Sequence, residues 1–259
     1  MKRGTVVPAF LDGGQWSASF GISWSNLLLR DLASEGPIFG AGTYLREQCG
    51  TGGIADGRNR LCEGFLATEG EWLWMVDTDM GFADDVVDRL VAAADRYDRP
   101  VVGGLAFAQR RLREKERPDL QAERFGIIPT IYQWRVLEDE AGFQAVRSYP
   151  RDSLVKTAGT GGACLLIHRR VVEKVHAKFP WSWFSLLTLP GALKGRPRTF
   201  SEDLSFCVRL AELDIPLHVH TGIQTSHEKG GIFLTEEEFD RQQAAEPAEP
   251  EVPESSSAA

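Results

Sequence analysis

Two aspartates separated by one residue, Asp77 and Asp79, directly follow the short apolar run 71–76. Alternate residues of an extended segment point to the same side, so both carboxylates can face one site. Two close carboxylates repel each other unless a cation lies between them, and their hard oxygens suit Mg²⁺ or Mn²⁺. Such a metal could hold a nucleoside diphosphate and neutralise its charge as it leaves. The pair equally fits a solvated turn with an aspartate helix cap, because Asp-x-Asp is frequent by chance.

A second acidic pair, Glu202 and Asp203, follows Ser201 at the predicted start of a helix. A carboxylate there could act as a general base that removes a proton from an acceptor hydroxyl. An N-cap serine followed by two acids that favour the helix dipole gives the same pattern. His227 lies beyond the last predicted strand, in a polar loop, where its imidazole could complete a carboxylate site for Mn²⁺ or remain solvated.

Two further motifs could lie close to a ligand. Arg58 and Asn59 are predicted to open a helix after the glycine-rich loop 50–54. Amides at a helix start, together with a guanidinium, could contact an anion or a nucleobase, although both residues could also lie on the surface. Gly161 and Gly162 could let the backbone approach a ligand closely, or could form a tight turn.

Trp181 and Trp183 share the loop 180–198, which is rich in proline and glycine. Sugar rings stack well on aromatic faces, so this loop could cover the acceptor side of a site. Tryptophans of a loop also commonly pack on the core, and the sequence does not separate these two cases.

The elements that must position these residues alternate between strand and helix in the first half of the chain. Apolar periodicity predicts strands over 5–11, 71–76 and 100–107, and helices around 25–32, 56–66 and 86–94. The second half predicts a hairpin from 130–137 and 143–149, strands over 163–167 and 215–220, and helices over 169–178 and from Ser201. We therefore predict an α/β fold with a mixed, mostly parallel central sheet. Its functional loops should lie at the carboxyl ends of the parallel strands.

The composition limits the classes of function. The 259 residues include 29 Lys and Arg against 37 Asp and Glu, which gives a net charge of −8, and 42% of the residues are hydrophobic. These are globular values, so wholesale disorder is excluded, and strong nucleic-acid binding is not expected. No uninterrupted apolar stretch approaches eighteen residues, so we expect no membrane span. The four cysteines form no CxxC pair, which favours a reducing cytoplasm.

We predict one folded domain over residues 1–235. Residues 236–259 are acidic and rich in proline and serine, and a segment of this kind cannot bury enough apolar surface to offset its chain entropy. This part is therefore predicted to be a disordered tail.

The order and spacing of the motifs resemble the GT-A glycosyltransferases. The likeness is closest to the family-2-like enzymes, including small versions encoded by tailed phages of actinobacteria. It covers roughly residues 4–232, and five motifs carry it: Arg58-Asn59, Asp77-Thr78-Asp79, Gly161-Gly162, Ser201-Glu202-Asp203 and His227. The resemblance implies a Rossmann-like three-layer sandwich.

The resemblance also assigns roles on the donor side. In that family the strand-end acids hold a divalent metal and the diphosphate of the sugar nucleotide, which are roles that fall on Asp77 and Asp79. The residue pair on the preceding helix contacts the nucleoside and matches Arg58 and Asn59. A histidine after the last strand can be a further metal ligand and matches His227.

On the acceptor side, the acid at the later helix start is the catalytic base of inverting members. Asp203 matches it, with Glu202 beside it. Four residues are predicted to lie on the acceptor side: Gly161, Gly162, Trp181 and Trp183.

The resemblance thus implies a glycosyltransferase that depends on Mn²⁺ or Mg²⁺. It would move a sugar from a nucleoside-diphosphate sugar to a hydroxyl of an unidentified glycan, protein, lipid or modified nucleotide, with inversion. The first strand departs from the family, because Pro8 is followed by Ala9-Phe10-Leu11-Asp12 where members commonly carry a Pro-Thr-Tyr-Asn-like run. The base of the donor is therefore not assigned.

Three alternatives remain. A phosphatase of the haloacid dehalogenase kind would carry its Asp-x-Asp on the first strand. A nucleotidylyltransferase would need a basic glycine-rich loop after that strand, and residues 12–16 contain no Lys or Arg. A GT-A scaffold that has lost turnover would only bind a nucleotide or a glycan.

Overall fold

The computed structural model describes residues 5–38, 44–111, 125–137 and 140–245. Within these residues a nine-stranded sheet has the order β10-β15-β5-β12-β3-β1-β2, with β4 and β16 paired to β15. The strands are β1 (Val6–Asp12), β2 (Leu45–Gln48), β3 (Trp72–Val76), β4 (Met80–Phe82), β5 (Val101–Leu105), β10 (Leu154–Thr157), β12 (Cys164–His168), β15 (Leu217–Lys229) and β16 (Ile232–Leu234). On the main path, β2, β1, β3, β5 and β15 run in one direction and β12 and β10 run in the other. The predicted mixed, mostly parallel sheet is confirmed.

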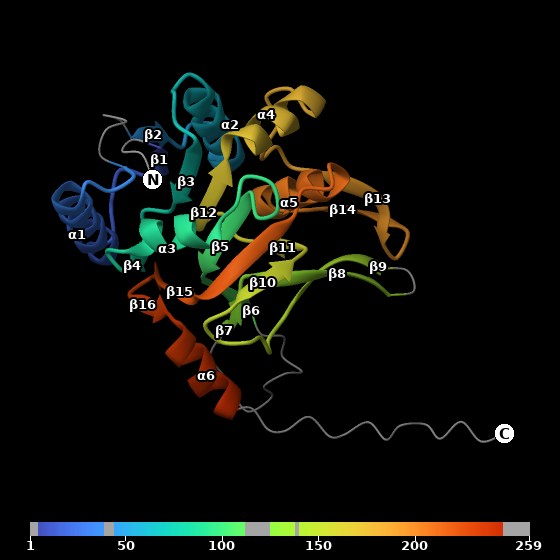
Figure 1. Ribbon diagram of the computed structural model, residues 1–259. Helices are drawn as coiled ribbons and strands as arrows, with labels where there is room; N and C mark the ends of the chain where they lie inside the picture. The colour runs from blue at the N-terminus through green and yellow to red at the C-terminus, as the bar shows by residue number, and fades with distance from the viewer. Residues whose placement is uncertain (1–4, 39–43, 112–124, 138–139, 246–259) are drawn as a thin grey trace.

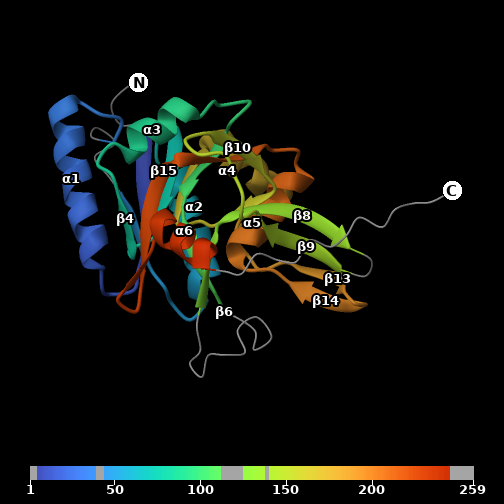
Figure 2. The ribbon, with the colours of Figure 1, turned by 90° about the horizontal axis from the view of Figure 1, so that it is seen from below.

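Helices cover both faces of this sheet (Figures 1 and 2). In the described part of the chain the helices are α1 (Ala18–Ser34), α2 (Gly53–Leu66), α3 (Val86–Ala93), α4 (Arg169–Lys178), α5 (Glu202–Glu212) and α6 (Glu236–Ala245). The apolar faces of α1 and α3 pack on one side of the sheet, and those of α2, α4 and α5 pack on the other. The predicted three-layer arrangement is therefore confirmed.

The central strand β3 shows why the sequence forms these layers. Its residues are all buried, and alternate side chains of a strand point to opposite faces. Leu73 and Met75 join the core under α2, α4 and α5, whereas Trp72, Trp74 and Val76 join the core under α1 and α3. An uninterrupted apolar run therefore marks a strand that is covered on both sides.

A second, five-stranded sheet has the order β11-β8-β9-β13-β14 and stands beside the first (Figure 2). Its strands are β8 (Ile131–Leu137), β9 (Glu140–Ala145), β11 (Gly159–Thr160), β13 (Thr188–Leu193) and β14 (Arg196–Thr199). The pairing of β8 with β9 confirms the predicted hairpin. A two-stranded sheet of β6 (Phe107–Arg111) and β7 (Phe125–Pro129) continues from the end of β5.

Two boundaries differ from the sequence prediction. β15 continues to Lys229 because its second half pairs with β4 and β16, so His227 lies on a strand and not in a loop. α6 occupies the first ten residues of the predicted tail. The folded part therefore reaches at least Ala245, while residues 246–259 lie outside the described residues. Among the described helices, none is both long enough and apolar enough to cross a membrane.

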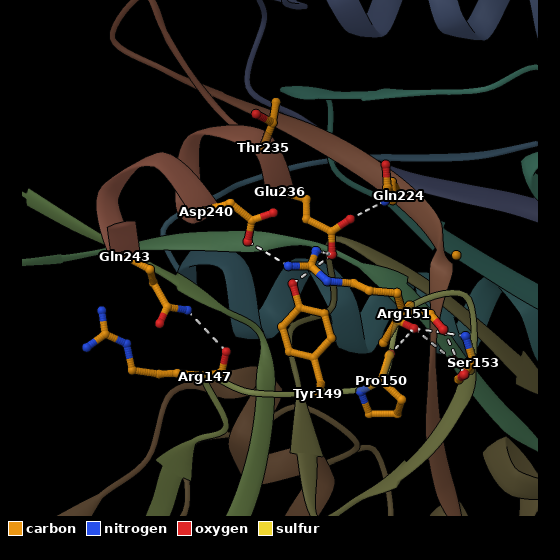
Figure 3. Close-up of polar contacts among 12 residues, drawn as sticks. Arg147, Tyr149, Pro150, Arg151, Ser153, Gln224, Thr235, Glu236, Asp240 and Gln243 are labelled. Carbon is orange, nitrogen blue, oxygen red and sulfur yellow. Dashed lines mark hydrogen bonds and ion pairs between the residues drawn. The ribbon is translucent and has the colours of Figure 1, made fainter. Parts of the chain in front are cut away.

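α6 is held by one buried ring and several polar contacts. The ring of Phe239 is buried between those of Phe107 and Tyr149, at centroid distances of 5.5 and 6.4 Å. The hydroxyl of Tyr149 donates to Glu236 over 2.9 Å, and Arg151 pairs with the same carboxylate (Figure 3). These partners lie far away in the sequence, so the acidic composition of the segment did not reveal them.

Replacement of Phe239 by alanine should release α6 from the body of the protein. Loss of a buried phenylalanine typically costs about 3–5 kcal/mol, so we expect a fall of about 3 kcal/mol in the free energy of unfolding by urea. Arg241→Ala is the matched control on the same helix, because its ion pairs with Glu237 and Glu238 are exposed and should contribute less than about 1 kcal/mol. Equal stability of the two variants would show that Phe239 does not anchor α6.

Candidate functional site

Four of the predicted site residues, Asp77, Gly161, Asp203 and His227, line one cleft of about 230 Å³. Asp77 follows β3, Asp203 lies in the first turn of α5, and His227 lies near the end of β15. Because β3, β5 and β15 run in the same direction, their carboxyl ends meet at one edge of the sheet. The topology thus joins side chains that are up to 150 positions apart, as in the contact between Asp79 and Lys229.

A buried guanidinium connects two of the acids. Arg58 is 4% exposed, and its Nη2 lies 3.1 Å from Oδ1 of Asp77, while its Nη1 pairs with Oδ1 of Asp203. Arginine suits this place because its planar fork can donate to two carboxylates at once. The positive charge also reduces the repulsion between the two acids. Arg58 therefore joins the end of β3 to the start of α5.

The position of Arg58 corrects one prediction. α2 begins at Gly53, so Arg58 and Asn59 lie inside the helix and not at its start. The amide of Asn59 is used within the protein, because its Oδ1 accepts from the backbone N–H of Phe184 over 2.7 Å and its Nδ2 donates to Ser185 over 3.0 Å. Arg58 thus orients the two acids, and Asn59 orients the loop that contains Phe184 and Ser185. Neither residue lies at the start of a helix, where free backbone amides could bind a ligand.

The glycine pair lies against this ion-pair network. A Cβ on Gly162 would overlap the Arg58 guanidinium and would lie 2.7 Å from Oδ1 of Asp203. A Cβ on Gly161 would have only ordinary contacts, 3.6 Å from Thr130. The close approach predicted for this pair therefore occurs at Gly162, toward the protein's own guanidinium, while Gly161 lines the cleft.

Asp79 forms a second polar group with two residues of β15. Its Oδ2 lies 3.3 Å from Nε2 of His227 and 2.6 Å from Nζ of Lys229. Burial alone would raise the pKa of the Asp79 carboxyl. The contacts with His227 and Lys229 outweigh that effect and lower this pKa to about 2, so Asp79 is an anion at neutral pH. The pairing of β4 with β15 sets the geometry, because it places His227 opposite Met80.

The imidazole of His227 is oriented by a backbone carbonyl. Its Nδ1 lies 2.9 Å from the oxygen of Phe107, and because a carbonyl can only accept, Nδ1 carries the hydrogen. Nε2 therefore faces Oδ2 of the Asp79 carboxylate. Two electron-pair donors at 3.3 Å need a proton or a cation between them.

The pair of Asp79 and His227 fits a divalent cation. Oδ1 of Asp79 and Nε2 of His227 are both buried and have no hydrogen-bond partner. A carboxylate oxygen with an imidazole nitrogen suits Mn²⁺, and the Phe107 carbonyl is the kind of outer partner that fixes a metal-binding histidine. Within the described ranges no three His, Cys, Asp or Glu side chains gather to hold an ion alone. Further ligands would have to come from a bound diphosphate or from water.

The two predicted loop tryptophans do not form one wall of the cleft. Trp183 is fully buried and its indole N–H donates to the Val172 carbonyl over 2.8 Å, so its assignment to the acceptor side is corrected: it is a core residue. Trp181 is 56% exposed, stands edge-on to His176, and does not line the cleft. Glu202, at the start of α5, does not line it either.

Sequence reasoning missed several residues of the site. Lys229 lies two residues after His227, and that spacing would have placed both on one face if the strand had been predicted to continue. Tyr132 lines the cleft beside Asp203, and it belongs to the hairpin that the sequence did predict. The missing signal was the long-range pairing that brings this hairpin to α5.

A larger hollow of about 340 Å³ lies between α5, β10 and β15 and contains none of the predicted site residues. Its charged lining residues are Lys156 and Asp214, and it also contains Cys207. Burial raises the pKa of the Cys207 thiol to about 12, so this group stays protonated and unreactive at neutral pH.

Comparison with known proteins supports the architecture. No protein-family model and no curated protein matches the chain. The solved structure of A197 from STIV is 16% identical with a TM-score of 0.51, over 91% of both chains. The structure of GalNAc-T7 with UDP, GalNAc and Mn²⁺ is 9% identical with a TM-score of 0.53, over 88% of this chain and 44% of that chain. The chain thus spans less than half of GalNAc-T7, and these likenesses support a GT-A-like fold.

Replacement of Gly162 by alanine should displace Arg58 from Asp203. We expect this overpacking to lower the free energy of unfolding by about 1–3 kcal/mol. Gly161→Ala is the matched control, because the new methyl group has room there, and the change in stability should stay within about 1 kcal/mol. Urea unfolding of both variants measures the difference. A Gly162→Ala protein as stable as Gly161→Ala would contradict the tight packing of the guanidinium.

Proposed function

We propose that this chain is a metal-dependent glycosyltransferase that moves a sugar from a nucleoside-diphosphate sugar to an acceptor hydroxyl, with inversion. The observation that carries the proposal is the meeting of Asp77, Asp203 and His227 in one cleft, with Asp79 paired to His227. Support also comes from the GT-A-like fold, and from GalNAc-T7, whose structure contains UDP, GalNAc and Mn²⁺.

On the donor side, Asp79 and His227 would hold the cation. A bound Mn²⁺ or Mg²⁺ supplies positive charge that stabilises a leaving diphosphate. The Phe107 carbonyl accepts from Nδ1 of His227, so Nε2 is turned toward Asp79 and would be the atom that binds the cation. Lys229 adds an ammonium on a flexible stem at the same place, and it can turn toward a phosphate oxygen. Asp77 lines the cleft and is the proposed second contact to the donor.

On the acceptor side, Asp203 is the proposed base. Its Oδ1 is buried beside Arg58, which leaves Oδ2 as the oxygen available to the cleft. An acceptor hydroxyl that donates to Oδ2 would pass its proton there while its oxygen attacks the anomeric carbon. Arg58 pairs with this carboxylate and fixes its orientation. Because the same guanidinium contacts Asp77, it sets the spacing between the donor and acceptor sides.

The direct test has two stages. Calorimetric titration with UDP, GDP and TDP, with and without Mn²⁺, measures metal-dependent nucleotide binding. A screen of the corresponding nucleotide sugars then measures release of the nucleotide, and NMR of the product gives the anomeric configuration. Nucleotide binding without transfer or hydrolysis would instead identify a scaffold that has lost turnover.

Replacement of His227 by alanine should abolish the effect of Mn²⁺ on nucleotide binding. Removal of an outer partner of a metal ligand already costs 10–100-fold in affinity, so loss of the ligand itself should cost about 100-fold or more. His218→Ala is the matched control, because His218 lies on the same strand outside the cleft. Calorimetry with UDP and Mn²⁺ measures both. Unchanged Mn²⁺-dependent affinity in the His227 variant would remove it from the metal site.

Replacement of Asp203 by asparagine should leave nucleotide binding intact and lower kcat for sugar transfer by about 10²–10⁴-fold, because an amide cannot accept the proton. Glu202→Gln is the control in the adjacent position, outside the cleft, and should retain near-normal kcat. If the Asp203 variant transfers sugar at the normal rate, or if the product retains its anomeric configuration, Asp203 is not the base.

A further inference from the structure

Two aromatic residues of β8 extend from the cleft along one face of the second sheet. Tyr132 lines the cleft together with Asp203. Trp134 follows two residues later, so both side chains leave the strand on the same face. The residue Trp134 is 37% exposed. A partly exposed aromatic surface therefore begins beside the proposed base and continues outward.

Phe143 of β9 packs beside the two rings on the same face of the sheet. Trp134 lies directly opposite Phe143 in the β8–β9 ladder. The centroid of Phe143 is 5.1 Å from that of Trp134, at an interplanar angle of 86°, and 6.5 Å from that of Tyr132. Phe200, just before α5, lies 5.8 Å from Trp134. Rings ordered by their neighbours in this way lose little further freedom when a ligand covers them.

The chemistry of the cleft limits what can bind there. Among the described residues that line it, the ionisable side chains are Asp77, Tyr132, Asp203 and His227, and none is lysine or arginine. The donor diphosphate has Lys229 and the proposed cation on the Asp79 side, whereas a phosphorylated or nucleic-acid acceptor beside Asp203 would meet a carboxylate and no lining Lys or Arg. Ser201 lines the cleft with a hydroxyl that makes no capping hydrogen bond, and it is therefore available to a polar ligand.

We infer that the acceptor of the proposed reaction is a neutral saccharide, and that it binds on the platform formed by Tyr132 and Trp134. The apolar C–H face of a sugar ring packs on aromatic rings, while its hydroxyls can reach Ser201 and Asp203. This inference rests on the proposed function, because it takes Asp203 as the base that receives the acceptor proton. It places acceptor binding on β8, and not on the loop that carries Trp181 and Trp183.

The test uses the full chain, in the presence of UDP and Mn²⁺, on an array of neutral, sialylated and phosphorylated oligosaccharides. The neutral oligosaccharide that binds best is then titrated against variants. Trp134→Ala should weaken its binding about tenfold, which is the effect of losing one stacked aromatic contact. Trp134→Phe keeps an aromatic face and should stay within about threefold. Trp181→Ala removes an exposed tryptophan outside the cleft and should change nothing.

Separate titration with UDP and Mn²⁺ distinguishes this inference from the proposed function. If the Trp134→Ala protein binds UDP and also binds the oligosaccharide with unchanged affinity, Trp134 is not part of the acceptor site, and the proposed platform is wrong. If the protein binds UDP but binds only charged oligosaccharides, or no oligosaccharide, the acceptor is not a neutral saccharide. Glycan binding that depends on Trp134 in a protein that binds no nucleotide would support the platform and overturn the transferase. The unfolding midpoint of each variant shows whether a loss of binding comes from a loss of fold. Trp134→Phe is the milder change, and its binding can be measured even if Trp134→Ala is destabilised.

Discussion

The guanidinium of Arg58 lies between the carboxylates of Asp77 and Asp203, and the arrangement of the cleft depends on this contact. A positive charge that is 4% exposed is tolerated only when anions pair with it, so the position requires both acids. Gly162 leaves the space that the guanidinium occupies. This ion-pair network therefore holds α2, the end of β3 and the start of α5 together.

A second constraint comes from the length of β15. Its extension past β5 to pair with β4 and β16 carries His227 and Lys229 to Asp79. The Phe107 carbonyl that orients His227 belongs to a residue whose ring packs against Phe239 of α6. The outer helix thus supports the strand end that positions the imidazole. The polar group around Asp79 lies on the proposed donor side, and the group around Arg58 joins that side, through Asp77, to the proposed acceptor side at Asp203.

Much of this arrangement follows from local sequence signals. The apolar run of β3, the acids directly after it and the acidic start of α5 predict both the sheet and the edge at which the cleft forms. The remainder depends on contacts between distant segments. The glycine-rich run before Arg58 indicated a later helix start than Gly53. The indole of Trp183 finds its acceptor on α4, which a loop composition cannot show. The acidic composition around Phe239 concealed a helix, because its partners lie far away along the chain.

In the proposed function, a divalent cation binds between Asp79 and His227 and anchors a nucleoside diphosphate in the cleft that Asp203 lines. The most direct measurement is a crystal structure with UDP and Mn²⁺, with anomalous diffraction recorded to locate manganese. We expect an anomalous peak within bonding distance of an Asp79 oxygen and Nε2 of His227, with the diphosphate beside it and Lys229 turned away from Oδ2 of Asp79. UDP bound elsewhere, or manganese away from both side chains while Lys229 still holds Asp79, would contradict it.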